Sequence, residues 1–364
     1  MRDDEVMARA IEIARSARRH TAPWPAVGCV LVRDGEVVGE GATGRFPEGP
    51  HAEVAALRAA GARARGATAY TTLEPCNHHG NTPPCTEALI DAGVVRVVTA
   101  VGDPDPLVAG RGYARLTNTG IAVDTGVGER EAARDLAAYL HHRRTGKAFV
   151  VAKVASSLDG SVAAADGTSQ WITSAAARAD AHELRADAQA IVVGARTALA
   201  DRPALTVRGV APMPARAPAR VLLDGRGRVP ADGPLFDTQL APTFVFTTER
   251  APVAAVDAWR AAGAKVEVIG VDASGAGVDL DTVWGALGSE GVLGVLVEGG
   301  GELLGAVVNG GYAQRIIAYV APTLLGVAGT PAFAFAGPQT LADATRYHLE
   351  DVKRVGDDVR LELG

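Results

Sequence analysis

The stretch "PHAEVAAL", residues 50–57, puts His51 and Glu53 two positions apart where an apolar, alanine-rich periodicity begins. This periodicity predicts a helix. The two polar residues either decorate the helix N-terminus, where a carboxylate suits the helix dipole, or belong to a metal site completed by "LEPCNHHGNTPPCTEAL" at residues 73–89. The choice decides the fold, because a metal site would tie the two segments together.

Three side chains in these segments are those of a catalytic zinc site, which uses three protein ligands and leaves the fourth position to water. His51 offers an imidazole, while Cys76 and Cys85 offer thiolates at a predicted strand end and helix start. Glu53 need not bind the metal, because its carboxylate can carry a proton from the water to a leaving amine. This is the arrangement of the zinc nucleobase deaminases, although eight residues separate the cysteines here and two are usual.

Other interpretations of single residues stay open. Each cysteine could fill a core position and His51 could be a polar residue at a helix start, so only their joint occurrence favours zinc. His78 and His79 lie between the two cysteines and could compete as ligands, although adjacent loop histidines more often face solvent or substrate. Cys29, inside the apolar run "VGCVLV" (27–32), is expected to be a buried structural thiol.

The composition bounds the class of protein. The chain has 364 residues, 48% apolar and 21% charged, which fits two globular domains of roughly 150 residues each. Its net charge of −6 argues against a nucleic-acid or membrane-surface partner, so we expect a small-molecule substrate that is gripped locally. The absence of a signal peptide and of a long apolar run predicts a cytoplasmic protein. Acidic two-domain enzymes of this kind are often homo-oligomers.

The first part of the chain shows a regular alternation of elements. Its periodicity predicts a helix over 3–19 and a hairpin turned at Asp34 and Gly35. Strands and helices then alternate as far as a helix from about Glu129 to His142. Such alternation predicts a three-layer αβα domain around a largely parallel sheet.

The basic run "HHRRTGK" (141–147) interrupts this alternation. We therefore predict two domains, at 1–145 and 146–364. The second again mixes strands and helices. Its end, roughly 347–363, alternates apolar and polar residues without an intervening helix, which predicts an antiparallel edge on a mixed sheet.

Several stretches of the first domain resemble one family. They are "VGCVLVRDGEVVGEG", "HAEVAALRAAG", "GATAYTTLEPCNHHGNTPPCTEALI", "RVVTAVGDPDP" and "VAGRG". They are similar to the deaminase half of the bifunctional riboflavin-biosynthesis family, a diaminohydroxyphosphoribosylaminopyrimidine deaminase fused to a 5-amino-6-(5-phosphoribosylamino)uracil reductase. The resemblance implies a cytidine-deaminase-like fold, zinc held by His51, Cys76 and Cys85, and Glu53 as the proton donor.

The second domain contains "VEGGGELLGAVV" (297–308), a strand, three glycines and a helix start. Backbone amides at such a start can cradle a phosphate, but the glycine spacing is not the dinucleotide fingerprint. A tight structural turn fits the pattern equally well.

The resemblance extends to this domain through "KVASSLDG", "GTSQWITS", "LRADAQAIVVGARTALADRPALTVR" and the glycine-rich segment. It implies a dihydrofolate-reductase-like, mixed-sheet domain that uses NADPH. The cofactor positions that it implies are Ala155, Trp171, Thr197, Asp201, Gly225, Gly300, Gly301, Glu302, Leu303, Leu304, Gly305 and Ala306. The substrate positions that it implies are Ser169, Arg185, Leu205, Arg208 and Glu298. A guanidinium suits a ribose phosphate, so Arg185 and Arg208 would supply the local positive charge.

Lys153 lies in the apolar run "FVVAKV" (149–154). A lysine is costly to bury unpaired, so it should face the cleft or pair with a carboxylate such as Asp201. Our hypothesis is that Lys153 polarises the sugar oxygen during hydride transfer.

The sequence departs from the family pattern at four positions. Trp24 stands where an asparagine is expected, and Ala42 and Thr43 replace a Tyr-His pair on the deaminase substrate side. Arg202 stands where a second aspartate is usual, and an extra cation there could alter the grip on the cofactor's 2'-phosphate.

These observations predict a two-step enzyme. It would deaminate 2,5-diamino-6-(5-phosphoribosylamino)pyrimidin-4(3H)-one and then reduce the ribosyl group of the resulting uracil to ribityl. One alternative is a single-activity reductase with a degenerate deaminase-like domain. Another is a non-catalytic, zinc-stabilised binding module.

Overall fold

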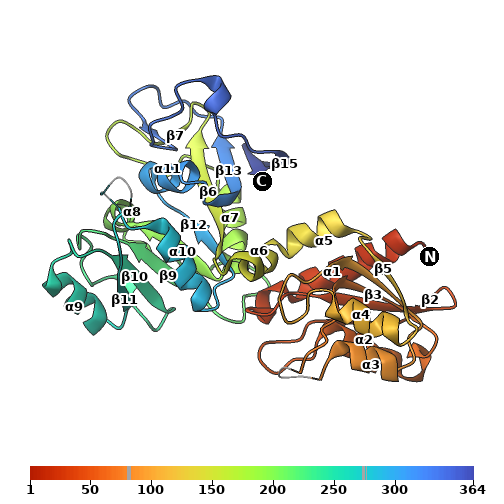
Figure 1. Ribbon diagram of the computed structural model, residues 1–364. Helices are drawn as coiled ribbons and strands as arrows, with labels where there is room; N and C mark the ends of the chain where they lie inside the picture. Colours follow the sequence, from red (N-terminus) through yellow and green to blue (C-terminus); the bar gives the residue numbers. More distant parts are fainter. Residues whose placement is uncertain (80–82, 273–274, 276) are drawn as a thin grey trace. The chain divides into compact units, whose positions relative to one another are not determined.

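The computed structural model describes residues 1–79, 83–272, 275 and 277–364. The chain forms two compact units, Met1–Gly146 and Lys147–Gly364 (Figure 1). The boundary lies inside the basic run 141–147. In the described residues, no helix combines the length and the apolar character needed to cross a membrane.

The N-terminal unit is built on a sheet whose strands follow the order β2-β1-β3-β4-β5. β1 pairs antiparallel with β2 and β3, and the remaining pairs are parallel. Asp34 and Gly35 turn the hairpin between β1 and β2 with φ of 51° and 80°, the left-handed geometry of a tight hairpin turn. The sheet was predicted to be largely parallel, but only β3, β4 and β5 are parallel to one another. The strands are β1 (Gly28–Arg33), β2 (Glu36–Ala42), β3 (Thr68–Leu73), β4 (Arg96–Val101) and β5 (Ala122–Thr125).

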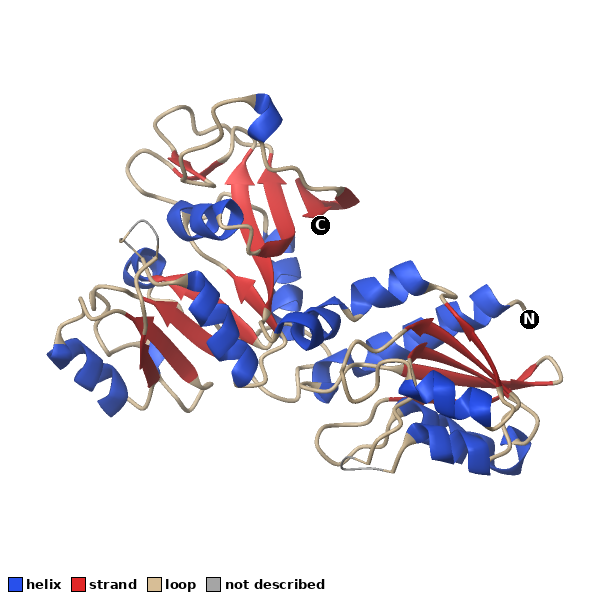
Figure 2. Ribbon diagram, viewed as in Figure 1, coloured by secondary structure: helices blue, strands red, loops and turns tan. Residues whose placement is uncertain are grey.

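Helices cover both faces of this sheet, as predicted (Figure 2). α1 (Asp3–Thr21) and α5 (Glu129–Asp135) lie on one face. The other face carries α2 (Ala52–Ala60), which continues into η1 (Gly61–Ala64), and then α3 (Cys85–Asp91) and α4 (Arg111–Asn118).

The continuous helix predicted from Glu129 to His142 is wrong. The segment forms α5 and then α6 (Ala137–Thr145), with Leu136 between them at ψ of 3°. Leu136 is buried, so the chain leaves helical geometry at a residue that the core holds.

The C-terminal unit has a larger sheet, with the order β11-β10-β9-β8-β12-β6-β13-β16-β15. All pairs from β11 to β13 are parallel, whereas β13 pairs with β16, and β16 with β15, antiparallel. The predicted antiparallel edge is confirmed. The strands are β6 (Phe149–Ser157), β8 (Ala190–Gly194), β9 (Ala219–Leu223), β10 (Thr243–Thr247), β11 (Lys265–Val268), β12 (Gly294–Val297), β13 (Ala313–Ala321), β15 (Leu349–Val355) and β16 (Asp358–Leu363).

Two large buried clusters and a small one that contains Tyr319 form the core of this unit. The first packs Trp284 and Leu304 against the central strands. The second surrounds Trp259, whose Nε1 donates to the Val229 carbonyl at 2.9 Å. The helices are α7 (Ala175–Asp187), α8 (Ala195–Asp201), α9 (Val253–Ala261), α10 (Leu280–Ser289) and α11 (Gly301–Asn309). Smaller elements are the β7 (Ser161–Ala163) and β14 (Thr330–Pro331) pair, η2 (Pro234–Phe236) and η3 (Leu341–Asp343).

Candidate metal centre and reductase site

The three predicted metal ligands meet in the N-terminal unit. His51 is the N-cap of α2, Cys76 follows β3, and Cys85 begins α3. His51 Nδ1 lies 3.2 Å from Cys85 Sγ and 3.6 Å from Cys76 Sγ, and all three atoms lie within 4.8 Å of one another. A tetrahedral zinc ion places its nitrogen and sulfur ligands about 3.5 Å apart. The residues present therefore fit zinc.

The pKa values of the two thiols are shifted in opposite directions. The Cys85 thiol and the His51 imidazole lower the pKa of Cys76, whereas contact with Cys76 and burial raise the pKa of Cys85. The pair therefore releases its first proton readily and holds the second. A divalent cation is the natural way to stabilise both thiolates at this separation.

Glu53 lies in the first turn of α2 and is only 4% exposed. The Cys85 thiol donates to Glu53 Oε2 at 3.3 Å, so the carboxyl group borders the metal atoms without being one of the three ligands. Burial raises its pKa. A carboxyl group in this position can accept or return a proton next to the metal.

A cavity of about 290 Å³ opens beside the ligands. His51, Glu53 and Cys76 line it, and His78 lies on its wall. The candidate ligand group contains neither His78 nor the exposed His79.

Trp24 and Thr43, two of the departures from the family pattern, also line this cavity. The Trp24 ring meets the His51 ring edge-on, with centroids 5.8 Å apart, and the Phe46 ring at 5.0 Å. Thr43 Oγ1 accepts the Val27 N–H at 3.0 Å. Trp24 therefore gives the cavity an apolar wall next to a metal ligand, while the Thr43 hydroxyl is used to hold the backbone.

The cavity lining also includes residues to which the sequence assigned no role. Tyr139 OH donates to both Asp103 carboxylate oxygens, at 3.0 and 3.2 Å, and both residues line the cavity. Burial raises the pKa of Asp103 to about 6. The "GDPDP" motif (102–106) offered a signal for Asp103, but nothing in the periodicity of α6 marked Tyr139.

Glu74, which also lines the cavity, holds the loop that carries Asp103. Its carboxylate accepts the backbone N–H groups of Gly110 and Gly112 at 3.1 and 3.0 Å, and that of Asp103 at 3.3 Å. One buried carboxylate thus fixes the loop after β4. Arg143 of α6 pairs with Asp105 of the same loop at 3.2 Å.

In the C-terminal unit, two predicted substrate residues bind each other. Arg185 Nε and Nη2 donate to the two carboxylate oxygens of Glu298 at 2.6 and 2.8 Å, and the side chains are 16% and 10% exposed. Arg185 Nη1 also donates to the Thr206 carbonyl at 3.1 Å. The Arg185 charge is therefore largely neutralised inside the protein, whereas Arg208 is exposed.

Lys153 is half-buried on β6. Burial lowers its pKa and the charge of Glu298 acts in the opposite direction. The carboxylate that acts on Lys153 is Glu298 and not the suggested Asp201, which is exposed at the end of α8 and forms no ion pair with Lys153 in the described residues. The strand register explains why Glu298 is the carboxylate that acts on Lys153. Val297 of β12 lies opposite Ala152 of β6. The next residue in each strand direction, Glu298 and Lys153, therefore lies at the same end of the sheet.

The glycine-rich segment combines a turn with tight packing. A Cβ on Gly301 would lie 2.1 Å from the Pro331 carbonyl oxygen, and one on Gly305 would lie 2.5 Å from that of Ala334. At Gly300 the nearest atom to a Cβ is Thr197 Oγ1, at 3.5 Å, which also accepts the Gly300 N–H at 3.0 Å. Gly300 is therefore less tightly packed than Gly301 and Gly305, and Thr197 already accepts its N–H.

The other predicted cofactor and substrate positions lie in different surroundings. Leu304 and Leu205 are buried in the core clusters, and Glu302 pairs with Arg196 at 2.9 Å on the surface. Trp171 is 67% exposed, with the Arg178 guanidinium 4.3 Å from the centroid of its ring. Gly225 is buried, Ala155, Ser169 and Leu303 are half-buried, and Ala306 is exposed.

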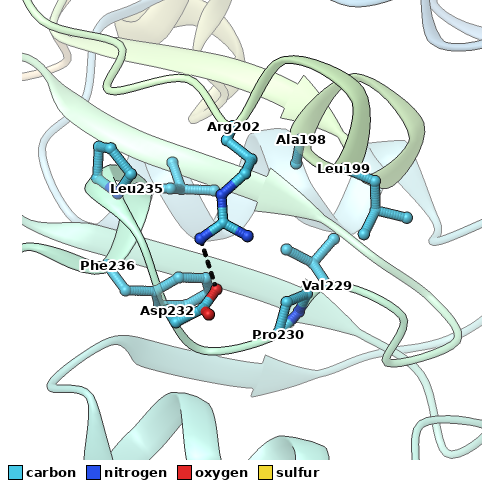
Figure 3. Close-up of a pocket in the computed structure, with 9 residues that line it drawn as sticks. Ala198, Leu199, Arg202, Val229, Pro230, Asp232, Leu235 and Phe236 are labelled. Carbon is cyan, nitrogen blue, oxygen red and sulfur yellow. Dashed lines mark hydrogen bonds and ion pairs between the residues drawn. The ribbon is translucent and has the colours of Figure 1, made fainter.

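Arg202 does not leave a free cation beside these residues. Its Nη2 lies 3.1 Å from Asp232 Oδ1, across a small pocket of about 30 Å³ that Leu235 and Phe236 also line (Figure 3). Asp232 therefore pairs, at the surface, with the cation that the resemblance placed next to the cofactor.

Two family models match the chain. The RibD C-terminal domain matches residues 148–361, and the cytidine and deoxycytidylate deaminase zinc-binding region matches residues 1–101. Together with the metal centre, they define an enzyme that joins a zinc-dependent deaminase region to a reductase domain.

Relatives match both parts over the full length. The riboflavin biosynthesis protein RibD of Escherichia coli (strain K12) is 42% identical, over 100% of this chain and 99% of the relative. The structure of Acinetobacter baumannii RibD, form 1, gives a TM-score of 0.88 at 40% identity, covering 99% of this chain and 98% of that one. The diaminohydroxyphosphoribosylaminopyrimidine deaminase/5-amino-6-(5-phosphoribosylamino)uracil reductase of Thermotoga maritima gives 0.85 at 31% identity, with the same coverage.

The chain belongs to the RibD family of riboflavin biosynthesis proteins. It is a bifunctional enzyme of riboflavin biosynthesis, a zinc-dependent deaminase and an NADPH-dependent reductase in one chain.

Proposed function

We propose that residues 1–145 deaminate 2,5-diamino-6-(5-phosphoribosylamino)pyrimidin-4(3H)-one, with His51, Cys76 and Cys85 as the zinc ligands. Zinc, when bound, lowers the pKa of water and so supplies a nucleophile near neutral pH. Glu53 takes up the proton of that water and returns it to the departing amine. The observation that carries this proposal is the buried Glu53 carboxyl group 3.3 Å from the Cys85 thiol, beside three ligand atoms within 4.8 Å of one another.

Residues 146–364 then reduce the ribosyl group of 5-amino-6-(5-phosphoribosylamino)uracil to ribityl. NADPH supplies the hydride, and the segment from Gly300 to Ala306 would hold it. Lys153 polarises the sugar oxygen, and the charge of Glu298, which follows the neighbouring strand β12, favours the protonated form of that lysine. Arg208 meets the substrate phosphate, because its charge is exposed while that of Arg185 is paired with Glu298.

The partners follow from the same chemistry. The substrate is a phosphoribosyl pyrimidine small molecule, and the net charge of −6 supports the prediction that no nucleic acid is involved. The cytoplasmic location and the assembly into a homo-oligomer stay predictions.

One coupled experiment tests both halves, with each variant as the control for the other. Glu53→Gln should lower ammonia release by about 10²–10⁴-fold, the usual contribution of a positioned proton carrier, while zinc content and reduction of the deaminated substrate stay normal. Lys153→Met should lower NADPH oxidation on the deaminated substrate and leave ammonia release unchanged.

The outcomes separate the alternatives. A wild-type enzyme with one zinc that releases no ammonia would be a single-activity reductase with a degenerate deaminase domain. A zinc-loaded chain with neither activity would be a binding module. Unchanged reduction by Lys153→Met would remove that lysine from the mechanism.

A further inference from the structure

A short segment after α8 is fastened to α7 at two points. Arg185 Nη1 donates to the Thr206 carbonyl at 3.1 Å, and the Arg208 backbone N–H donates to His182 Nδ1 at 3.2 Å. His182 and Arg185 are three residues apart, so they lie on one face of the helix. The segment 206–208 is thus clamped by a carbonyl contact and an amide contact from the same helix.

The segment 206–208 lies between two buried residues but is not itself buried in the core, so the contacts with α7 are what hold it. Leu205 is buried with φ of 49°, and Val210 is buried again, but Arg208 between them is exposed. In the part of the chain that the structure describes, no hydrogen bond or ion pair holds the Arg208 guanidinium. The hydrogen bond from the Arg208 backbone N–H to His182 therefore fixes the backbone position from which the Arg208 side chain extends.

The chemistry of this contact fixes the state of the imidazole. A backbone N–H can only donate, so His182 Nδ1 must carry a lone pair and the ring must be neutral. A protonated ring would set two N–H groups against each other. We propose that His182 is a positioning residue of the reductase, whose neutral ring holds segment 206–208 on α7 so that Arg208 can reach the anionic group of the substrate.

The charges around His182 come from three elements. Burial lowers the pKa of His182, and the positive charges of Arg185 on α7 and Arg208 in the segment act in the same direction. The Glu298 charge after β12 and the Thr206 backbone oppose them. The net shift is downward, so the neutral ring is the stable form near neutral pH. As the pH falls, protonation breaks the contact with the Arg208 N–H, and substrate affinity falls with it.

This inference rests on the proposed role of Arg208 in substrate binding, and its test keeps the two apart. His182→Asn retains an acceptor near the position of Nδ1 but cannot be protonated, and His182→Leu removes the acceptor. At about pH 8, His182→Leu should raise the KM for the deaminated substrate about fivefold, the factor for one lost hydrogen bond. Its kcat and its KM for NADPH should stay within about twofold, and His182→Asn should restore the KM.

The pH profile is the second measurement. The substrate phosphate itself titrates near pH 6, so the informative quantity is the ratio of the wild-type KM to that of His182→Asn. Because the pKa of His182 is lowered, this ratio should stay flat down to about the ordinary histidine pKa of 6.5 and rise only below it, toward the roughly fivefold effect of His182→Leu. A ratio that stays constant would overturn the proposal.

Amide hydrogen exchange of the peptide covering 205–210 gives a readout that needs no activity. His182→Leu should exchange faster there, and His182→Asn should match the wild type. If the wild type does not reduce the substrate, the proposed function fails and exchange alone decides on the clamp. Faster exchange with an unchanged KM would show a merely structural role and would also overturn the proposal.

Discussion

At the scale of single residues, Asp103 is the clearest example of a side chain whose surroundings give it an unusual charge state. It lies in the cavity wall, 7% exposed, and Tyr139 OH donates to it. Burial raises its pKa from 3.8 to about 6. The folded state therefore keeps the proton to a higher pH than the unfolded chain does, and the ionised form costs stability above that range.

Replacing Asp103 should expose this cost. Because its folded pKa is raised, stability is fully present below about pH 4 and is lost as the pH rises through about 6. The variant Asp103→Asn cannot ionise. The free energies of unfolding of Asp103→Asn and the wild type are measured by denaturant titration at each pH. The difference in favour of the variant should grow by on the order of 1–3 kcal/mol between about pH 4 and pH 7.

An exposed carboxylate in the same unit provides the control. Glu48 is exposed, so the difference between Glu48→Gln and the wild type should stay flat over the same range. A flat difference for Asp103→Asn as well would contradict the raised pKa of this buried carboxyl group.

At the scale of elements, the contact between β2 and α2 sets the position of the metal centre. A Cβ on Gly41 would lie 2.4 Å from the Ala56 nitrogen and 2.5 Å from the Ala52 carbonyl oxygen. α2 can approach the strand this closely only over glycine. The N-terminus of α2 carries His51 and Glu53. Gly41 therefore sets the position of these two side chains by allowing α2 to lie close to β2.

The variant Gly41→Ala should therefore affect stability and metal binding together. Overpacking of this kind costs about 1–3 kcal/mol, and the displaced helix should weaken zinc retention during dialysis. Gly102→Ala is the matched control, because the nearest atom to a Cβ there is 3.7 Å away. If the Gly41→Ala variant is clearly destabilised but retains zinc, the displacement of α2 does not reach His51.

Sequence periodicity predicted most elements, and its failures have local causes. Asp34 and Gly35 identified the first hairpin, and the alternation at 347–363 identified the antiparallel edge. The break at Leu136 went unpredicted because this apolar residue fits a helical pattern and leaves it only when the core buries its side chain. α8, with seven residues, is too short for its periodicity to stand out.

At the scale of the whole molecule, the two activities are assigned to separate compact units, Met1–Gly146 and Lys147–Gly364. The candidate metal ligands all lie in the first. The glycine-rich segment, Lys153 and the Arg185–Glu298 pair all lie in the second.

Removal of zinc should therefore separate the activities. Treatment with a chelator should lower ammonia release by at least about 100-fold, because activation of water depends on the metal. NADPH oxidation on the deaminated substrate should stay within about twofold. Added zinc should restore ammonia release, whereas a parallel loss of both activities would show that the reductase also depends on the metal.

The sequence by itself determined the residue types of the metal centre, the order of the elements and the family resemblance, because these depend on local spacing. Only the tertiary structure decided which distant groups meet. Glu298 rather than Asp201 acts on Lys153 because β12 and β6 are neighbours in register. Tyr139 reaches Asp103 because α6 follows a break at a buried leucine. Such partners depend on strand register and helix direction, which packing of the whole unit sets and no local pattern contains.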